Sequence, residues 1–373
     1  MPIVWLTDST LVVPVLDDDF LRSIPHFKQG YTDMYPQMRF GGRIECASVE
    51  KHRPRGDSPA SGPLAAGCEA SGRHRSRAAL LFSGGVDAFA SLIAHLDERP
   101  ELVTLHGADI GLSDTEGWER VRSHTEQTAR RYGLGSRFVH TNFRTFIDER
   151  ALNALVRDSG EKYWYGFQSG IGIIGHYTPI AWAAGTELLY IASSVNAADN
   201  GSEPCASDLT IDGQVRFCGC RVIHDGYEFT RQDKVRRIVE YSRASGTAVN
   251  LRVCWISTGG GNCCRCEKCY RTMFELFAEG ADPRDYGLRY TKRDISRSEI
   301  RLRTDRAFYD PYYWPGLRDC LFSNPAAVVP EGAAWLERCD LTRRPKTPRF
   351  VLYGLFRHIG RKLRRIAQRL GIR

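Results

Sequence analysis

The residues most suited to binding or catalysis lie in one short turn at positions 83–87, of sequence Ser-Gly-Gly-Val-Asp. An apolar run at 78–82 precedes the turn and predicts a short buried strand, and apolar residues at helical spacing follow it. A glycine turn between a strand and a helix points backbone N–H groups and the positive end of the helix dipole at one place. Because glycine has no Cβ, the backbone can approach a phosphate closely. The turn therefore predicts a loop that binds the phosphates of a nucleotide.

A set of cysteines forms the second group, and their spacing is typical of metal sites. The four lie at intervals of nine, three and three residues and are Cys254, Cys263, Cys266 and Cys269. Three thiolates in a Cys-x-x-Cys-x-x-Cys segment can converge on one ion, and a fourth from the preceding segment completes a tetrahedron. We therefore expect Zn²⁺ here, while the spacing is also compatible with an iron–sulfur cluster. Cys264, inside the same loop, is left as a spare thiol.

Strands and helices alternate along the chain between these two groups. Such alternation is typical of a parallel sheet with helices on both faces. The predicted strands cover residues 78–82, 101–106, 137–140, 187–193 and 220–224. The predicted helices cover residues 118–132, 171–184, 232–243 and about 270–279. We therefore expect an α/β fold built on a parallel five-stranded doubly wound sheet, Rossmann-like in plan.

The carboxyl edge of this sheet is where a ligand should bind. The turn at 83–87 lies there, and so do Asp109 and Ser193, which follow the second and fourth predicted strands. A literal Gly-x-Gly-x-x-Gly occurs at 170–175. No clear strand precedes it, so we expect it to serve close helix packing and not dinucleotide binding.

Composition divides the chain into five regions. Residues 1–50 carry short apolar and aromatic runs separated by Gly and Pro, which predicts a small β-rich region. Residues 51–76 are mostly Pro, Gly, Ser, Arg and His, as in a flexible linker. We expect the α/β domain with the cysteine site over 77–285, an irregular or helical region over 286–340 and a helical tail over 341–373.

The tail is strongly basic and amphipathic. It holds eleven Lys and Arg and no Asp or Glu, so the net charge of +8 leaves the rest of the chain at −3. Nucleic acid binding therefore finds no support in the overall charge. Apolar residues on one helical face, with Arg and Lys opposite, fit a helix that lies on an anionic membrane surface, docks on an acidic partner or packs on the protein's own body.

The chain carries no sign of membrane insertion or secretion. It has no run of about eighteen apolar residues, and its first residues lack a basic and apolar signal. The clustered cysteines favour metal ligation in a reducing compartment over a disulfide framework. We expect a cytoplasmic protein whose tail is the part able to contact the inner membrane surface, and a homodimer is compatible with these features.

The turn resembles the PP-loop of the ATP pyrophosphatase superfamily, whose pattern is Ser-Gly-Gly-x-Asp-Ser/Thr after the first strand. Enzymes of that superfamily split ATP between its α and β phosphates and adenylate a carbonyl oxygen, and the resemblance implies an adenine nucleotide α-hydrolase-like sheet. One departure is Ala88, which stands where the pattern has Ser or Thr. The missing hydroxyl removes a hydrogen bond worth about 1.5–3 kcal/mol when its partner is charged.

The loop and the cysteine spacing together make residues 78–277 similar to the 7-cyano-7-deazaguanine synthases of that superfamily. The segment 195–201, Val-Asn-Ala-Ala-Asp-Asn-Gly, is similar to the family's Val-Asn-Ala-x-Asp stretch, and Lys234 matches a lysine that opens the next helix. The resemblance implies a structural zinc ion. It also implies that ATP with Mg²⁺ drives conversion of a carboxylate to an amide and then to a nitrile, with ammonia as the nitrogen source.

Two departures affect the second substrate. The family recognises the deazaguanine with an Arg-Asn pair before the helix that begins near Ile171, but this chain has Gln168 and Ser169 there. The family's Asp-Cys-Arg is replaced by Pro-Cys-Ala at 204–206. The resemblance therefore supports ATP activation more than the deazaguanine substrate. We expect a related ligase with a changed small-molecule carboxylate acceptor and with ammonia or an amine as the nitrogen donor.

The resemblance and the glycine turn assign roles to individual residues. The loop N–H groups and hydroxyl would hold the β and γ phosphates, Asp87 would orient the loop or reach Mg²⁺, and Lys234 would neutralise charge developing on the phosphates. The candidate nucleotide-binding residues are Ser83, Gly84, Gly85, Val86, Asp87, Ala88, Asp109 and Ser193. The candidate catalytic residues are Asp87 and Lys234, and the four spaced cysteines are the candidate metal ligands.

Two alternatives stay open. The first is a tRNA-modifying thiolase of the same superfamily with an iron–sulfur cluster on the cysteines. The slightly acidic body argues against it, although the basic tail could recruit RNA. The second, suggested by Ala88, is a catalytically inactive PP-loop scaffold that binds a partner or a membrane surface through its zinc module and tail.

Overall fold

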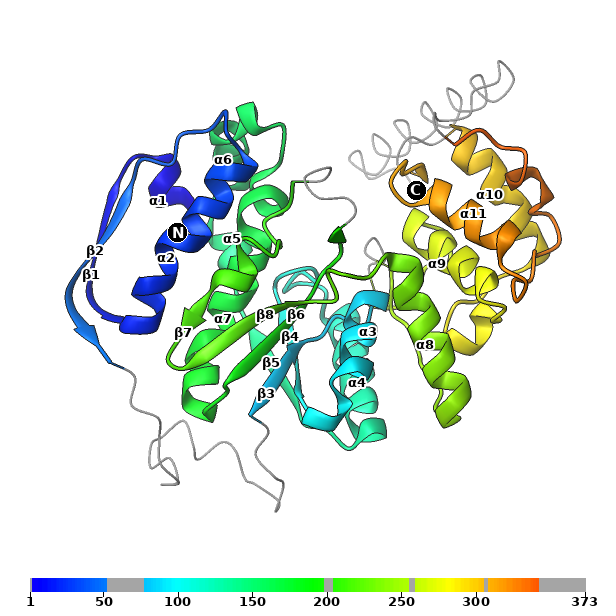
Figure 1. The fold of residues 1–373 in the computed structure, drawn as a ribbon, viewed down its shortest axis with the longest axis horizontal. Coiled ribbons are helices and arrows are strands. Elements are labelled where there is room, and N and C mark those ends of the chain that lie inside the picture. The colour runs from blue at the N-terminus through cyan, green and yellow to red at the C-terminus, as the bar shows by residue number, and fades with distance from the viewer. Residues whose placement is uncertain (1, 52–76, 198–203, 255–258, 305–307, 342–373) are drawn as a thin grey trace. The chain divides into compact units, whose positions relative to one another are not determined.

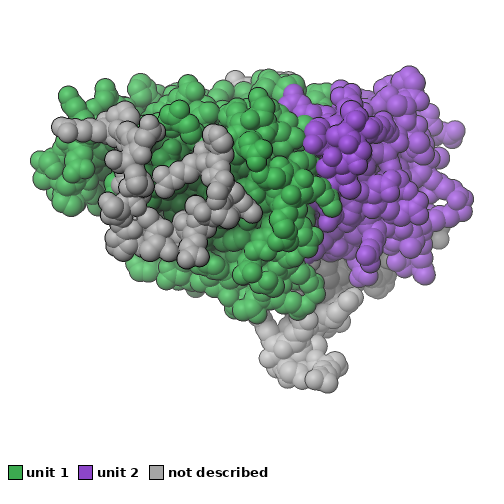
Figure 2. All heavy atoms as spheres, turned by 90° about the horizontal axis from the view of Figure 1, so that it is seen from below, with its two compact units in different colours: residues 1–234, 258–260 green, residues 235–257, 261–373 purple. Residues whose placement is uncertain are grey.

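A six-stranded sheet forms the centre of the larger part of this protein (Figure 1). The computed structural model describes residues 2–51, 77–197, 204–254, 259–304 and 308–341. The chain forms unit 1, Met1–Lys234 with Thr258–Gly260, and unit 2, Val235–Ser257 with Gly261–Arg373 (Figure 2). The predicted linker and basic tail lie outside the described residues, apart from residue 51 and residue 341.

The sheet belongs to unit 1, and its strands run in the order β5-β4-β3-β6-β8-β7. The strands are β3 (Ala78–Leu81), β4 (Glu101–His106), β5 (Ser136–His140), β6 (Leu188–Ala192), β7 (Arg216–Phe217) and β8 (Cys220–Asp225). All but β7 are parallel, and each of these five matches a predicted strand. The sixth strand, β7, pairs antiparallel with β8, and the sequence does not predict it because two residues carry no periodicity.

The chain changes its direction across the sheet after β5. From β3 it steps to β4 and β5 on one side, and it then crosses to β6 and β8 on the other side of β3. At such a switch point the connecting loops separate and leave room for a ligand beyond the carboxyl ends of the strands. The glycine turn at 83–87 follows β3 and therefore begins at this point.

Helices cover both faces of the sheet (Figure 1). α3 (Val86–Ala94) and α4 (Thr115–Tyr132) pack on one face, and α7 (Ser169–Ala184) packs on the other. The two predicted helices at 118–132 and 171–184 are confirmed, and each ends at a glycine with a positive φ. On the α7 face a buried apolar cluster takes alternate strand residues, as the two-residue period of a strand requires. These include Ala79, Leu81, Leu189, Ile191 and Val222.

Shorter elements join these helices and strands. They are α5 (Phe143–Phe146), α6 (Glu149–Leu155), the 3-10 turns Leu96–Glu98, Arg157–Ser159 and Asp212–Gln214, and the π-helix Trp164–Gln168. The π-helix runs directly into α7, and π-helical turns occur often at functional sites. α8 (Arg231–Ser245) follows β8 and begins within unit 1.

The N-terminal residues also belong to unit 1, and they are only partly β-structured. They form α1 (Pro2–Leu6), β1 (Thr10–Asp17), α2 (Asp18–Met34) and β2 (Arg43–Glu50), with β1 and β2 paired in parallel. The prediction of a β-rich region is therefore wrong for α2. This helix begins at Asp17, whose carboxylate accepts a hydrogen bond from the Phe20 N–H at 3.0 Å. Pro25 and Gly30 within the helix obscure its period in the sequence.

One function of α2 is to support the π-helix. The Tyr31 hydroxyl donates to the Phe167 carbonyl at 2.8 Å, and the Tyr35 hydroxyl donates to the Gly166 carbonyl at 3.0 Å. Both tyrosines are fully buried. Buried carbonyl oxygens need partners, and these two hydroxyls supply them, so the N-terminal segment is part of the sheet domain's core.

The described part of unit 2 is helical. It contains the rest of α8, then α9 (Glu267–Ala278), α10 (Lys292–Thr304) and α11 (Trp314–Ser323), with 3-10 turns at Pro283–Tyr286 and Ala334–Leu336. α11 packs on α9, where the rings of Phe274 and Trp314 lie 5.8 Å apart. The predicted irregular or helical region at 286–340 thus contains two helices. Among the described residues of the chain, no helix is both long enough and apolar enough to cross a membrane.

Candidate functional site

The turn that was predicted to bind phosphate joins β3 to α3. Gly84 has a φ of +77°, which residues with a side chain rarely adopt, so the turn depends on glycine there. Gly85 is the N-cap of α3, and its N–H donates to the Ser83 hydroxyl at 3.3 Å. The first N–H groups of any α-helix have no acceptor within the helix. The turn therefore places the positive end of α3 at the carboxyl edge of the sheet.

Asp87, in the first turn of α3, lies between two cations from the first turn of α8. Arg231 Nη1 donates to Asp87 Oδ2 at 3.0 Å, and Lys234 Nζ lies 3.6 Å from Asp87 Oδ1. Because Arg231 and Lys234 are three residues apart on one helix, they can reach the same carboxylate. The structure thus brings the two predicted catalytic residues together and adds Arg231, to which sequence analysis assigned no role. We call these three side chains and the turn the loop site.

Lys234 is held from two directions. Its side chain is 3% exposed, and its ammonium donates to the Ser193 carbonyl at 2.5 Å. Burial lowers the pKa of the Lys234 ammonium, and the Asp87 carboxylate opposes that shift. The Ser193 hydroxyl itself donates to the Val195 carbonyl at 2.7 Å. Ser193 therefore positions Lys234 through its main-chain oxygen.

The other predicted residues of the loop site differ in exposure. Val86 and Ala88 are buried in the first turn of α3, with exposed fractions of 1% and 2%. Ala88 thus packs as a methyl group at the position where the PP-loop pattern has a hydroxyl. Asp109 lies beyond β4 and is exposed. Residues 198–201 of the predicted Val-Asn-Ala-x-Asp stretch lie outside the described residues.

The charges of the loop site favour an anionic ligand. Arg231, Lys234 and the N-terminus of α3 face the Asp87 carboxylate, and the Asp225 carboxylate also acts on Lys234. Phosphate oxygens accept hydrogen bonds from main-chain N–H groups and form strong ion pairs with Arg and Lys. A carboxylate such as Asp87 is the kind of ligand that Mg²⁺ prefers. The residues fit a polyphosphate accompanied by a divalent cation.

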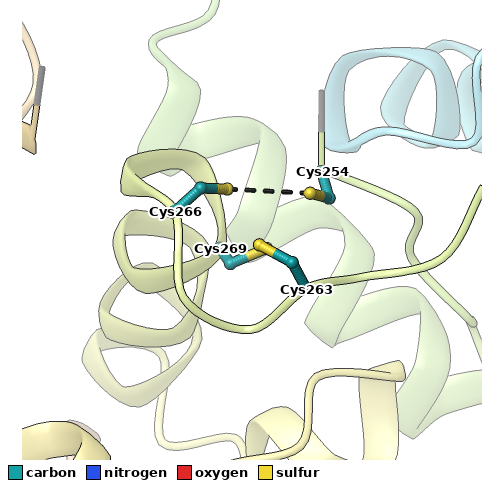
Figure 3. A group of neighbouring side chains, drawn as sticks. All are labelled: Cys254, Cys263, Cys266 and Cys269. Carbon is teal, nitrogen blue, oxygen red and sulfur yellow. Dashed lines mark hydrogen bonds between the residues drawn. The ribbon is translucent and has the colours of Figure 1, made fainter. Parts of the chain in front are cut away.

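Four cysteines converge in unit 2, and we call them the cysteine cluster (Figure 3). The Sγ atoms of Cys254, Cys263, Cys266 and Cys269 all lie within 4.8 Å of one another. The Sγ atoms of Cys263 and Cys269 are 3.9 Å apart, and those of Cys254 and Cys266 are 3.8 Å apart. On a tetrahedron with Zn–S bonds of about 2.3 Å, neighbouring sulfurs lie about 3.8 Å apart. The structure therefore brings all four predicted ligands together at the spacing of a single zinc site.

The start of α9 holds two of these cysteines. Cys266 is the N-cap of α9, and Cys269 lies in its first turn, where the helix dipole stabilises thiolates. Hydrogen bonds from Cys266 and Cys269 hold the pKa of Cys263 well below its usual value. The hydrogen bond with Cys263 raises the pKa of Cys266 to about 12. The thiolate is the form in which each of these cysteines would bind a metal ion.

Asn262 holds the two chain segments of the cluster together. Its side-chain oxygen accepts hydrogen bonds from the N–H groups of Val253, at 2.9 Å, and Cys254, at 3.3 Å. Its amide nitrogen donates to the carbonyls of Leu251, at 2.7 Å, and Gly287, at 3.0 Å. Asn262 was not predicted from the sequence, where its one signal is a polar side chain directly before the predicted ligand Cys263.

Two further predictions concern cysteines and glycines. All described cysteines are free, and Cys264 lies outside the cluster.

A Cβ at Gly170 would lie 2.2 Å from Asp212 Oδ1 and 2.7 Å from the Ala206 carbonyl oxygen, whereas one at Gly175 would meet nothing within 4 Å. The glycine motif at 170–175 therefore serves close packing, as predicted, and Gly170 is the position that requires it.

Comparisons with models of protein families, with curated proteins and with solved structures gave no match for this chain. Its function must therefore be inferred from its own residues. Two features carry that inference: a glycine turn at the switch point of a sheet, with Arg231 and Lys234 beside its aspartate, and a cysteine cluster with the dimensions of one metal site.

Proposed function

We propose that this protein is an ATP-dependent ligase of the ATP pyrophosphatase type, which adenylates a carboxylate acceptor and then replaces AMP with a nitrogen nucleophile. The observation that carries the proposal is the placement of Asp87 between Arg231 and Lys234, directly after the glycine turn. A Ser-Gly-Gly-x-Asp turn alone is too short a motif to identify a phosphate-binding site. Its position at the switch point, with two cations from a distant helix on its aspartate, is what a phosphate-binding site requires.

The loop site would act mainly by binding and charge stabilisation. The N–H groups of Gly84, Gly85 and Val86 and the Ser83 hydroxyl would hold the β and γ phosphates. Mg²⁺, when bound through Asp87, would supply further neutralising charge on the phosphates. An acceptor carboxylate oxygen would attack the α phosphorus, and the bond to the β-phosphate oxygen would break, releasing pyrophosphate. Lys234 would then stabilise the charge that develops on this leaving group.

The cysteine cluster would serve a structural role. Four thiolates around one ion leave no open coordination position for a substrate, which is typical of structural zinc. The ion would join the segment that carries Cys254 to the start of α9, where Cys266 and Cys269 lie. We propose Zn²⁺ as the resident ion. An iron–sulfur cubane fits less well, because it binds each thiolate to a different iron and so holds the sulfurs farther apart than one ion does.

The products of ATP turnover test this proposal. Wild-type protein is incubated with ATP, Mg²⁺, ammonium and a panel of aromatic and heteroaromatic carboxylic acids that includes carboxylated 7-deazaguanine. We expect AMP and pyrophosphate in amounts that depend on one of the acids. Gly85→Arg is the control, because the φ of −79° at Gly85 is open to any residue and the added side chain is expected to occupy the loop. Formation of ADP and phosphate, or equal turnover by Gly85→Arg, would contradict the proposal.

A second candidate is a nucleotide-binding scaffold without catalysis, which the buried Ala88 favours. A scaffold of this kind would bind ATP with Mg²⁺ and release no pyrophosphate with any acid. The same two measurements, binding and product formation, separate it from the ligase.

A further inference from the structure

A second polar cluster lies in unit 1, apart from the side chains of the loop site. His224 in β8 and Asp212 in the 3-10 turn Asp212–Gln214 both have side chains with 0% exposure. His224 Nδ1 lies 3.3 Å from Asp212 Oδ2, and the Ser207 hydroxyl donates to the same oxygen at 2.6 Å. In the neutral tautomer whose Nδ1–H donates to the carboxylate, Nε2 keeps a free lone pair.

Two atoms of this pair lack hydrogen bonds. Within the described part of the chain, neither His224 Nε2 nor Asp212 Oδ1 has a hydrogen-bond partner, although both atoms are buried. Each such buried polar atom costs about 1–3 kcal/mol when it is left unsatisfied. Both are acceptors, so the group that would satisfy them must be a donor.

The surroundings favour a donor that is also a cation. The groups that act most strongly on Asp212 are His224, Ser207 and Asp208, and none of them is a permanent cation. Burial raises the pKa of Asp212, and the hydrogen bonds from His224 and Ser207 oppose that rise. Tyr31 and Cys205 also interact electrostatically with Asp212, the Tyr227 ring lies 6.0 Å from that of His224, and none of them carries a positive charge. The guanidinium of Arg216 is already bonded to the carbonyls of Gly213, Val215 and Val222. A carboxylate ligand would be repelled here, whereas an N–H cation would be attracted.

The register of the sheet places this pair close to the loop site. Leu81 of β3, Ile191 of β6 and His224 of β8 are aligned neighbours on three adjacent strands. Two strand spacings put the His224 and Leu81 Cα atoms about 10 Å apart. Asp225, the next residue, bonds His95 at the end of α3, so His224 faces the opposite side, where α7 packs. Gly170 of α7 lies next to Asp212 there, since a Cβ at this glycine would be 2.2 Å from Asp212 Oδ1.

We propose that His224 and Asp212 bind the nitrogen donor, an ammonium ion or a primary amine, with an N–H hydrogen bond to His224 Nε2. The role of this site in the reaction rests on the proposed ligase function, whereas the binding itself does not. The proposal adds a second-substrate site, on the α7 side of the sheet near the end of β8, to the phosphate site at the carboxyl edge.

The same pair can activate the bound nitrogen. An ammonium ion has no lone pair, so it must first lose one proton, and Nε2 accepts that proton. The freed lone pair of ammonia then forms the C–N bond to the acyl carbon, while the C–O bond to AMP breaks and its electron pair leaves with AMP. The new amide nitrogen releases its surplus proton to water. Asp212 acts as a positioning residue that fixes the tautomer of His224 and stabilises its imidazolium form.

Nitrogen NMR of the full-length protein with ¹⁵N-labelled histidine tests the binding. We expect the His224 Nε2 resonance to shift and saturate as ammonium chloride is added. Tetramethylammonium chloride at the same ionic strength is the control, because it has the charge but no N–H donor. An equal response to both salts, or no response to ammonium, would overturn the proposal. The resonance is assigned to His224 by its loss in His224→Gln. If that variant does not fold, Asp212→Asn assigns it instead, because the His224 ring-nitrogen resonances should then report a mixture of tautomers.

A kinetic ratio tests the role in the reaction. With an acid that supports pyrophosphate exchange, the ratio of amide formed to pyrophosphate exchanged should fall about 100-fold in His224→Gln, as expected when a general base is lost. An unchanged ratio would overturn the proposed role of His224 while leaving the ligase intact. Absence of exchange in the wild type would contradict the ligase instead, and the ammonium titration would still decide whether the site exists.

Discussion

The cysteine cluster and the loop site are assembled in different ways. The cluster takes four identical ligands from sixteen consecutive positions, 254–269, and its geometry follows from the demands of one ion. The loop site takes Asp87 from α3 and two cations from α8, more than a hundred residues further along the chain, and the Ser193 carbonyl after β6 holds one of these cations. Spacing along the chain therefore predicts the first site, whereas the second appears only once the sheet has brought its parts together.

The two sites also differ in what they depend on. The cluster gathers negative charge and needs a cation to hold it, so we expect metal removal to affect stability. The loop site gathers two cations, Arg231 and Lys234, whose counter-ion Asp87 is already present, so it can fold without ligand. Zinc content should therefore respond to changes in the cysteine cluster, and ATP affinity to changes in the loop site. The following variants test whether the two sites are independent in this way.

The largest effect should come from the cluster. In Cys269→Ser we expect loss of bound zinc and of the stability that it supplies, because structural zinc binds with about 10–16 kcal/mol of free energy. Metal content and thermal unfolding measure both. Cys264→Ser is a matched control in the same loop and should keep its metal. Full zinc occupancy in Cys269→Ser, or metal loss in Cys264→Ser, would break the assignment of the cluster.

Removal of a cation should affect the loop site next most strongly. We expect Lys234→Met to weaken ATP binding about 100-fold, since it removes a charge-assisted interaction with the phosphates and Arg231 still pairs with Asp87. Zinc content should not change. Calorimetric titration with ATP and Mg²⁺ measures the affinity, and the exposed Lys292→Met is the control. Equal affinities of the two variants would show that Lys234 does not meet the ligand.

A smaller loss should follow from loosening the cluster's support. Asn262→Ala removes three hydrogen bonds that hold the segments carrying Cys254 and Cys263 together and a fourth to the Gly287 carbonyl. We expect zinc affinity to fall at least about 10-fold, as for other residues that orient metal ligands. Competition with a chromogenic chelator measures this affinity. Wild-type affinity in Asn262→Ala would mean that the metal alone organises the loop.

The smallest change should be a gain. Ala88→Ser restores the hydroxyl of the PP-loop pattern in the first turn of α3, and we expect ATP to bind about 10-fold more tightly. The same calorimetric titration measures the gain, with Ala90→Ser, buried later in the same helix, as the control. A similar effect of both substitutions would indicate a change in helix packing instead of a new contact with the phosphates.

Much of unit 1 could be predicted from the sequence because its signals are local. Five strands and the helices α4 and α7 were predicted from short apolar runs and terminal glycines. α2 was not, since Pro25 and Gly30 interrupt its pattern, and neither was its support of the π-helix through Tyr31 and Tyr35, which depends on residues more than a hundred positions away.

The site residues divide in the same way. The four cysteines and the glycine turn were found because each forms a compact motif. Arg231, Asn262 and the pair of His224 and Asp212 were missed, because their importance lies in partners that only the fold supplies. A lone histidine or arginine in a sequence carries no such signal.

Binding of α,β-methylene ATP with Mg²⁺, measured by calorimetry on the wild type and on Gly85→Arg, tests the central claim most directly. The analogue cannot be cleaved between its α and β phosphates, so the measurement needs no acceptor. We predict one site per chain in the wild type and no binding in Gly85→Arg, with zinc content equal in both. Absence of binding in the wild type, or equal binding in Gly85→Arg, would contradict the assignment of the turn as a nucleotide site.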